Sequence, residues 1–155
     1  MSRLYRFIVL IALIISGFSL TASAAVFKAR LQLAWGTDGI KPEGKAWTEL
    51  DAKAKDKLRN LRWKNYWVVK TAESAVSGTY QRTALSDKCA VDIREVGNGL
   101  LEVRIFDLKA GTEPKLVKTV QHAIKALKDG EYCIIAGDDK NNWENAWIVI
   151  ITGVR

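Results

Sequence analysis

The chain contains one histidine, His122, and this single imidazole limits the catalytic chemistry that the sequence supports. A serine or cysteine nucleophile needs a base beside it, and neither a Gly-x-Ser-x-Gly elbow nor a Cys-His signature is present in the sequence. With Cys89 and Cys133, His122 supplies at most three soft metal ligands, at spacings that match no zinc module. We therefore predict a protein that is not an enzyme and that carries no metal and no cofactor.

The densest cluster of polar residues runs from 137 to 146, between two apolar segments. It contains oxygen donors of the kind that calcium prefers, namely Asp138, Asp139, Asn141 and Glu144. Their spacing does not match the EF-hand pattern, and Lys140 places a competing positive charge among them. Adjacent carboxylates also point apart and do not flank one glycosidic bond. A solvated hairpin loop is the simplest interpretation, and an enzyme that uses the 138–144 carboxylates is a weaker alternative.

Trp143 lies within this polar cluster, where core packing is harder to argue than for the other tryptophans. A tryptophan beside asparagine and aspartate is typical of β-sandwich modules that bind sugars, since a sugar ring has an apolar face and its hydroxyls bind amides and carboxylates. The candidate ligand-binding residues are Trp143, Asp138, Asp139 and Asn141. Trp63 and Trp67 are spaced to share one face of a strand. Core packing is the simpler role for Trp35, Trp63, Trp67 and Trp147.

Basic residues outnumber acidic ones by 24 to 17, which gives a formal charge of +7. An excess of positive charge attracts polyanions, and the candidates for a basic face are Lys28, Arg30, Lys64 and Lys70. The basic residues between 53 and 59 are interleaved with acidic ones, which indicates a solvated helix face. Because an exported protein rarely meets nucleic acid, we expect an envelope protein or polysaccharide as the partner and no nucleic acid.

Export is predicted by residues 1–24, which have the parts of a secretory signal peptide in the right order. Two arginines precede an apolar run over residues 7–15, and small residues follow it up to Ala24. A serine and a glycine interrupt the run before the ~20 residues of a spanning helix, so cleavage is favoured over a retained anchor. We predict a mature domain of residues 25–155, without a membrane span, in the periplasm or outside the cell.

Cys89 and Cys133 are the two cysteines of the chain. Export places them in a compartment that permits oxidation, so we expect a disulfide between them, with two buried free thiols as the alternative. The expected bridge closes a long loop and stabilises the fold by roughly 3–4 kcal/mol in the chain-entropy model.

Alternation of apolar and polar residues from 26 to 35 predicts a half-buried strand at the start of this domain. A helical stripe follows near residues 48–61, with Thr48 as the expected N-cap. The segment 97–99, Gly-Asn-Gly, lies between two alternating segments and predicts a hairpin, because these residue types accept a positive φ. The expected strands after the helix are residues 63–70, 73–76, 79–85, 89–96, 100–108, 115–121, 132–136 and 146–152.

The fold class expected from these segments is an antiparallel β-sandwich of seven or eight strands, or a partly open barrel, with one short amphipathic helix. Tryptophan is absent between Cys89 and Cys133, so an immunoglobulin-type topology is not expected.

Three short motifs resemble a group of small uncharacterised secreted bacterial proteins. They are Trp35-Gly-Thr-Asp38 after the first strand, Arg62-Trp-Lys-Asn-Tyr66, and the closing Trp147-Ile-Val-Ile150. The resemblance implies export and a mostly β domain, and it implies no activity.

The function expected from the sequence is that of a non-enzymatic binding or scaffolding module at the bacterial envelope, acting through protein contacts. The alternative is a carbohydrate-binding module in which Trp143 and one of Asp138 or Asp139 recognise the sugar.

Overall fold

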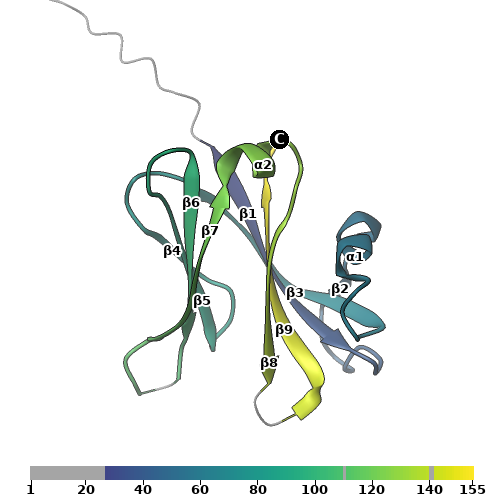
Figure 1. The fold of residues 1–155 in the computed structure, drawn as a ribbon. Coiled ribbons are helices and arrows are strands. Elements are labelled where there is room, and N and C mark those ends of the chain that lie inside the picture. The colour runs from purple at the N-terminus through teal and green to yellow at the C-terminus, as the bar shows by residue number, and fades with distance from the viewer. Residues whose placement is uncertain (1–26, 110, 140–141) are drawn as a thin grey trace, which may run out of the picture.

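The computed structural model describes residues 27–109, 111–139 and 142–155, with side chains for all of these except 138, 139 and 142–144. The predicted signal peptide, residues 1–24, lies outside these ranges. Within them, nine strands and two short helices form two antiparallel sheets that pack face to face (Figure 1). The antiparallel β-sandwich predicted from the sequence is confirmed.

Sheet A contains five strands in the order β2–β3–β1–β9–β8, and sheet B contains four in the order β4–β5–β6–β7. The strands of sheet A are β1 Lys28–Thr37, β2 Thr48–Glu49, β3 Asn65–Ala75, β8 Cys133–Asp139 and β9 Asn142–Gly153. The strands of sheet B are β4 Gln81–Ala84, β5 Cys89–Glu95, β6 Leu100–Asp107 and β7 Lys115–Ala123. The helices are α1 Ala52–Leu58 and α2 Ile124–Lys128.

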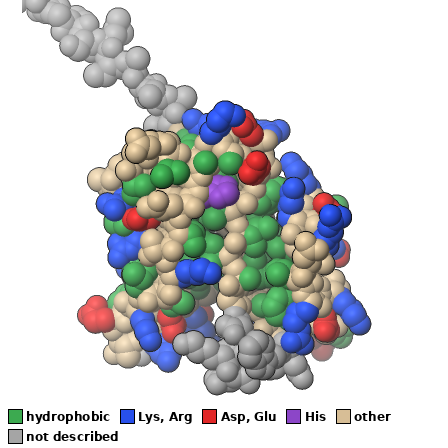
Figure 2. All heavy atoms as spheres, viewed as in Figure 1, with side chains coloured by type: hydrophobic (Ala, Val, Ile, Leu, Met, Phe, Trp, Pro, Cys, Tyr) green, Lys and Arg blue, Asp and Glu red, His purple; other side chains and the backbone are tan. Residues whose placement is uncertain are grey.

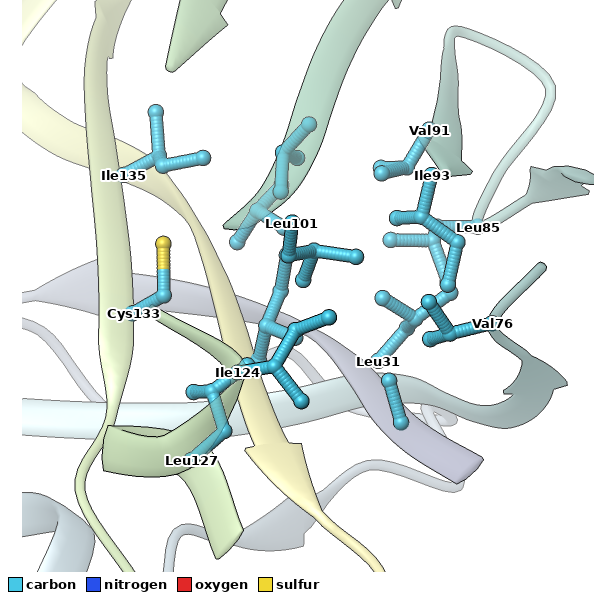
Figure 3. Packing of buried hydrophobic residues seen from close by; sticks show 14 of the residues in the cluster. Leu31, Val76, Leu85, Val91, Ile93, Leu101, Ile124, Leu127, Cys133 and Ile135 are labelled. Atoms are coloured by element: carbon cyan, nitrogen blue, oxygen red, sulfur yellow. The ribbon is translucent and has the colours of Figure 1, made fainter. Parts of the chain in front are cut away.

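The main hydrophobic core lies between the two sheets, as strand alternation requires. Leu31 and Leu33 of β1 project from sheet A toward Ile93 and Leu101 of sheet B, and α2 closes one end with Leu127. Figure 3 shows Leu31 of sheet A and Ile93 and Leu101 of sheet B converging in this core. We call the face of sheet A that carries this core its inner face.

A second core covers the outer face of sheet A, where α1 packs. Ala54 and Leu58 of the helix are buried against Tyr66 and Ile148 of the sheet. Asp51, rather than the predicted Thr48, caps the helix, with its carboxylate accepting a hydrogen bond of 2.9 Å from the Ala54 amide. Thr48 instead pairs with β3, so the helix is shorter than the predicted 48–61 segment.

Arginine side chains cover the outer face of sheet B. The guanidinium of Arg104 lies 4.7 Å from the Tyr80 ring and 5.4 Å from the Phe106 ring. Arg94 and Arg82 extend this stack, at 4.2 Å from Tyr80 and 4.4 Å from Phe106. Cation–π contacts of this kind let long charged side chains cover apolar rings.

A register shift in the β1–β3 pair changes which residues of β3 face the core. Leu33 lies opposite Lys70, whereas the next residue, Ala34, lies opposite Val68, so Val69 is an extra residue of β3. The predicted hairpin at 97–99 is present between β5 and β6, and Asn98 has a φ of 53°.

The predicted disulfide between Cys89 and Cys133 is wrong, since the structure contains both as free cysteines. Cys89 belongs to β5 of sheet B and Cys133 to β8 of sheet A, so the sandwich core separates them. Cys133 begins β8 just after α2, whereas Cys89 pairs with Asp107 at the end of β6 away from α2, so the two cysteines lie at opposite ends of the sandwich. The Cys133 side chain points into this core in Figure 3.

Candidate functional site

Three tryptophans lie side by side across the inner face of sheet A. Trp35 on β1 is the register partner of both Trp67 on β3 and Trp147 on β9. We call Trp67, Trp35 and Trp147 the tryptophan row. Directly opposed residues of antiparallel strands share one face, and Trp35 has the same parity as the core residues Leu31 and Leu33.

The tryptophan row lies beyond the part of sheet A that sheet B covers. Trp35 and Trp67 are half-buried, and 40% of the Trp147 surface is exposed. Figure 1 shows the C-terminal end of β1 and the adjoining part of β3 diverging from sheet B. The row is therefore a partly open aromatic surface rather than part of the core between the sheets.

A loop of residues 38–47 borders the row and adds a fourth indole. The Trp47 ring packs edge-on against Trp35 at 5.4 Å and against Trp147 at 6.4 Å between ring centroids. Lys41 Nζ lies 5.9 Å from the Trp67 ring centroid and donates a hydrogen bond of 3.4 Å to the Trp47 carbonyl. The loop thus supplies both an aromatic contact and a positive charge.

Polar residues occupy the positions that follow the tryptophan row on the same face of β1, β3 and β9. Thr37 is the register partner of Asn65 on β3 and of Asn145 on β9, two residues from the tryptophan row and on the same face. Thr37 Oγ1 accepts a 3.0 Å hydrogen bond from the Gly39 amide, and Asn65 Nδ2 donates one of 2.9 Å to the Gly39 carbonyl. These two bonds fix the start of the loop, which positions Lys41 and Trp47.

Two buried side-chain nitrogens, Trp67 Nε1 and His122 Nε2, have no hydrogen-bond partner among the described residues. An unsatisfied buried donor costs about 1–3 kcal/mol. In the tryptophan row, the Trp67 N–H is therefore a donor that an acceptor atom reaching the site would satisfy.

The sequence-predicted sugar site is located at the same end of the sheet as the tryptophan row. Gly137 pairs with Trp147, and the next pair, Asp138 with Ala146, leads into the β8–β9 hairpin. The side chains of Asp138, Asp139 and Trp143 lie outside the described part of the structure, as does all of Asn141. The backbone register therefore places Asp138, in the pair after Gly137 and Trp147, next to the row.

The residues predicted to form a basic face are not gathered together. Arg30 is on the outer face of sheet A and pairs with Glu73 at 3.1 Å, and Lys28 is at the same end of β1. Lys70 is opposite Leu33, a position of the inner face, and Lys64 precedes β3 at the other end of the sheet. The prediction fails because β1 and β3 are antiparallel and the register shift intervenes.

Trp63 and Trp67 do not share a strand face as predicted. Trp63 precedes β3 and packs against the core beneath α1, whereas Trp67 belongs to the tryptophan row. Sequence reasoning missed the row because a single sequence does not give the register between distant strands. The available signal was that Trp35, Trp67 and Trp147 all lie in alternating apolar segments.

The described ranges contain neither a metal-binding cluster nor a membrane-spanning helix. No group of three or more histidine, cysteine, aspartate or glutamate residues there is arranged to hold a metal ion. Within those ranges, neither helix has the length and apolar character to cross a membrane.

A scan of protein-family models, a search of curated proteins and a search of solved structures each return no match to this chain.

Proposed function

We propose that the chain is an exported, non-enzymatic binding module that binds a glycan of the bacterial envelope on the tryptophan row. The observation that carries the proposal is the register of Trp67, Trp35 and Trp147 on three adjacent strands at an open part of the sheet. Export is supported by the signal-peptide pattern of residues 1–24.

The size and chemistry of the row suit a sugar chain. Adjacent strands lie about 4.8 Å apart, so three indoles span roughly 10 Å, comparable with a disaccharide. Indoles stack on the apolar faces of sugar rings, and hydroxyl groups need polar partners at the border. Asn145 lies two residues from Trp147 on the same face of β9 and offers an amide to these hydroxyls. Lys41, beside Trp67, adds a positive charge that favours an acidic glycan.

Intrinsic fluorescence titrated with a panel of envelope glycans tests the proposal. We expect a saturable change in the wild type that is lost in Trp147→Ala, because Trp147 is the most exposed indole of the row. Trp63→Phe is the matched control, since it removes an indole that lies outside the row and packs beneath α1. A ligand response that survives Trp147→Ala, or no response to any glycan, contradicts glycan binding on this surface.

A second candidate function, scaffolding through a protein partner, is favoured by β7. This outer strand of sheet B exposes 43% of Leu116 and 61% of Val117, and Lys115 and Lys118 flank them. Figure 2 shows hydrophobic side chains between the two sheets on the side of β7 and β8, with basic side chains around them. An acidic partner strand that pairs with β7 matches this pattern.

Scaffolding is tested by comparing partner capture from native envelope with wild-type and Val117→Glu baits. We expect Val117→Glu to lose a specific partner that a Lys88→Gln bait retains. Equal capture by all three proteins argues against pairing at β7.

A further inference from the structure

A pocket of about 250 Å³ lies on the outer face of sheet A, opposite to the face of the tryptophan row. Its walls come from β1, β9, the start of α1 and the segment before β8. We call it the outer pocket, and the side chains that matter for its chemistry are those of Arg30, Gln32, Asp51, Lys53, Tyr132 and Arg155.

Two positive charges converge at the mouth of the outer pocket above Gly130. The point where a Cβ atom of residue 130 would stand is 2.5 Å from Arg155 Nη2 and 3.6 Å from Lys53 Nζ. Arg155 Nη2 also donates to the Asp129 carbonyl at 3.3 Å, and Lys53 Nζ lies 5.7 Å from the Tyr132 ring centroid. Like charges held this close favour a bound anion between them.

Positively charged side chains outnumber negatively charged ones by three to one in the lining of the outer pocket. Asp51 is the one carboxylate among the described lining residues, and it accepts the capping hydrogen bond from Ala54. Glu73, outside the lining, binds Arg30 through Nη2 at 3.1 Å. A guanidinium has five N–H donors, so this single contact leaves Arg30 with donors for a ligand.

Neutral donors complete the outer pocket. Gln32 and Thr152 belong to its lining on the sheet, and Tyr132 belongs to its lining in the segment before β8. Burial, and to a lesser extent the charge of Asp51, raises the pKa of Tyr132, so the phenol keeps its proton and acts as a donor at neutral pH.

We propose that the outer pocket binds a small tetrahedral oxyanion, either phosphate or sulfate, free or as the terminal group of a small molecule. Donors approach from the sheet, from Lys53 of α1 and from Arg155 after β9, which suits a tetrahedral anion better than a planar carboxylate. The volume lies below the roughly 300–1,000 Å³ typical of larger ligands, which restricts the occupant to a small group.

Backbone amide NMR titrations of the mature chain with inorganic phosphate and with sulfate test this site. Chloride keeps the ionic strength constant, so that general screening is the same in every sample. We expect saturable shifts at Lys53, Gly130 and Thr152 with at least one of the two anions. The anion that binds more tightly identifies the terminal group as phosphoryl or sulfate.

Charge-removing variants locate the anion. We expect Lys53→Gln and Arg30→Gln each to weaken binding by about tenfold or more, because each removes charge-assisted hydrogen bonds. Lys88→Gln, which makes the same charge change near β5 of sheet B, is expected to leave the affinity unchanged. Thermal unfolding verifies that each variant is folded. An absence of saturable shifts with both anions, or an equal loss in Lys88→Gln, overturns the proposal.

The test is independent of glycan binding. The outer pocket and the tryptophan row lie on opposite faces of sheet A, so Trp147→Ala is expected to leave the oxyanion affinity unchanged. Loss of glycan binding with retained oxyanion binding, or the reverse, therefore separates the two proposals.

Discussion

Trp35 and Trp147 are register partners on adjacent strands, and both indoles contact the same third ring, that of Trp47. These two contacts join the loop between β1 and β2 to β9, the neighbour of β1 on the side away from β3. Removal of one indole therefore changes the surroundings of the other two.

This arrangement predicts energetic coupling between Trp35 and Trp47. In a double-mutant cycle with Trp35→Ala and Trp47→Ala, we expect a coupling of about 0.5–1.5 kcal/mol in the free energy of unfolding, the range for edge-to-face aromatic pairs. Urea denaturation measures the four proteins. The cycle of Trp47→Ala with Trp63→Ala is the control and is expected to be additive, because Trp63 packs in the other core. Additivity in both cycles contradicts the packing described here.

The ion pair of Arg82 with Asp92 is predicted to be important for stability. Arg82 Nε and Nη2 donate to the two carboxylate oxygens at 2.7 and 2.9 Å, and the Asp92 side chain is 8% exposed. Arg82→Met leaves this carboxylate without its cation, and we expect a loss of about 1.5–3 kcal/mol in the free energy of unfolding. Chemical denaturation measures the loss.

The exposed pair of Arg59 with Asp56 provides the matched control. Its atoms are 3.6 Å apart, and its side chains are 74% and 66% exposed. Surface pairs contribute about 0–1 kcal/mol, so Arg59→Met is expected to have a small effect. A comparable loss of stability in both variants would show that burial of Asp92 does not strengthen its ion pair with Arg82.

Glu102 is predicted to make folding sensitive to acid. The Tyr80 hydroxyl donates a hydrogen bond to Glu102, and this bond, followed by the charge of Arg94, lowers the pKa of the carboxyl below its usual value of 4.5. A lowered pKa in the folded state stabilises the fold above pH 4.5, and this stabilisation is lost as the pH falls through the lowered value.

Tyr80→Phe tests the Glu102 prediction, because it removes the hydroxyl and keeps the ring beneath Arg94 and Arg104. We expect the variant to lose less stability than the wild type between neutral pH and pH 3, as measured by thermal melts across this range. Identical pH profiles for the two proteins contradict the role assigned to the hydroxyl.

The two thiols are predicted to be unreactive in the folded protein. Burial, with a smaller effect of Asp107, raises the pKa of Cys89 to about 11, and burial also raises the pKa of Cys133. We expect slow modification by a thiol reagent at pH 8 and rapid modification of both cysteines after denaturation. The mass of the protein under oxidising, non-reducing conditions is expected to correspond to two thiols. An intramolecular disulfide in the folded protein would contradict the separation of the two cysteines.

The raised pKa of Cys89 also predicts that the free energy of unfolding decreases at alkaline pH. The folded thiol keeps its proton at pH values where the unfolded thiol has lost it, so its contribution to stability is complete below about pH 9 and disappears as the pH rises to about 11. Cys89→Ala is expected to lose less stability over this interval than the wild type.

The pattern of residue types along the chain is sufficient to predict much of the fold. The hairpin at 97–99 follows from residues that accept positive φ, and the opposed pairs Val91–Ile105 and Ile93–Val103 follow from strand alternation. Thr48 was misassigned because its residue type suits both a cap and a strand, and pairing with Val68 decides between them. At this position the strand pairing of Thr48 with Val68 outweighs the preference of threonine for a helix N-cap.

The candidate sites required information that local pattern does not contain. The tryptophan row depends on the registers of β1 with two strands distant in the sequence, and the outer pocket joins Arg30 to Lys53 and Arg155 across the fold. The cysteines were misassigned for the same reason, since spacing along the chain does not say which sheet a strand joins.

The extra residue Val69 has a consequence for variation of this chain. Because Val69 is extra, Ala72 and Trp67 project from the same face of sheet A although they are five residues apart. Loss of Val69 alone would leave Lys70 next to Val68 in a regularly paired strand, with Tyr66 still in the core beneath α1 and Trp67 still in the tryptophan row. A one-residue deletion is therefore expected to be tolerated at this position and not in the regularly paired parts of β3, so homologues that keep the three neighbouring indoles are expected to vary in length here.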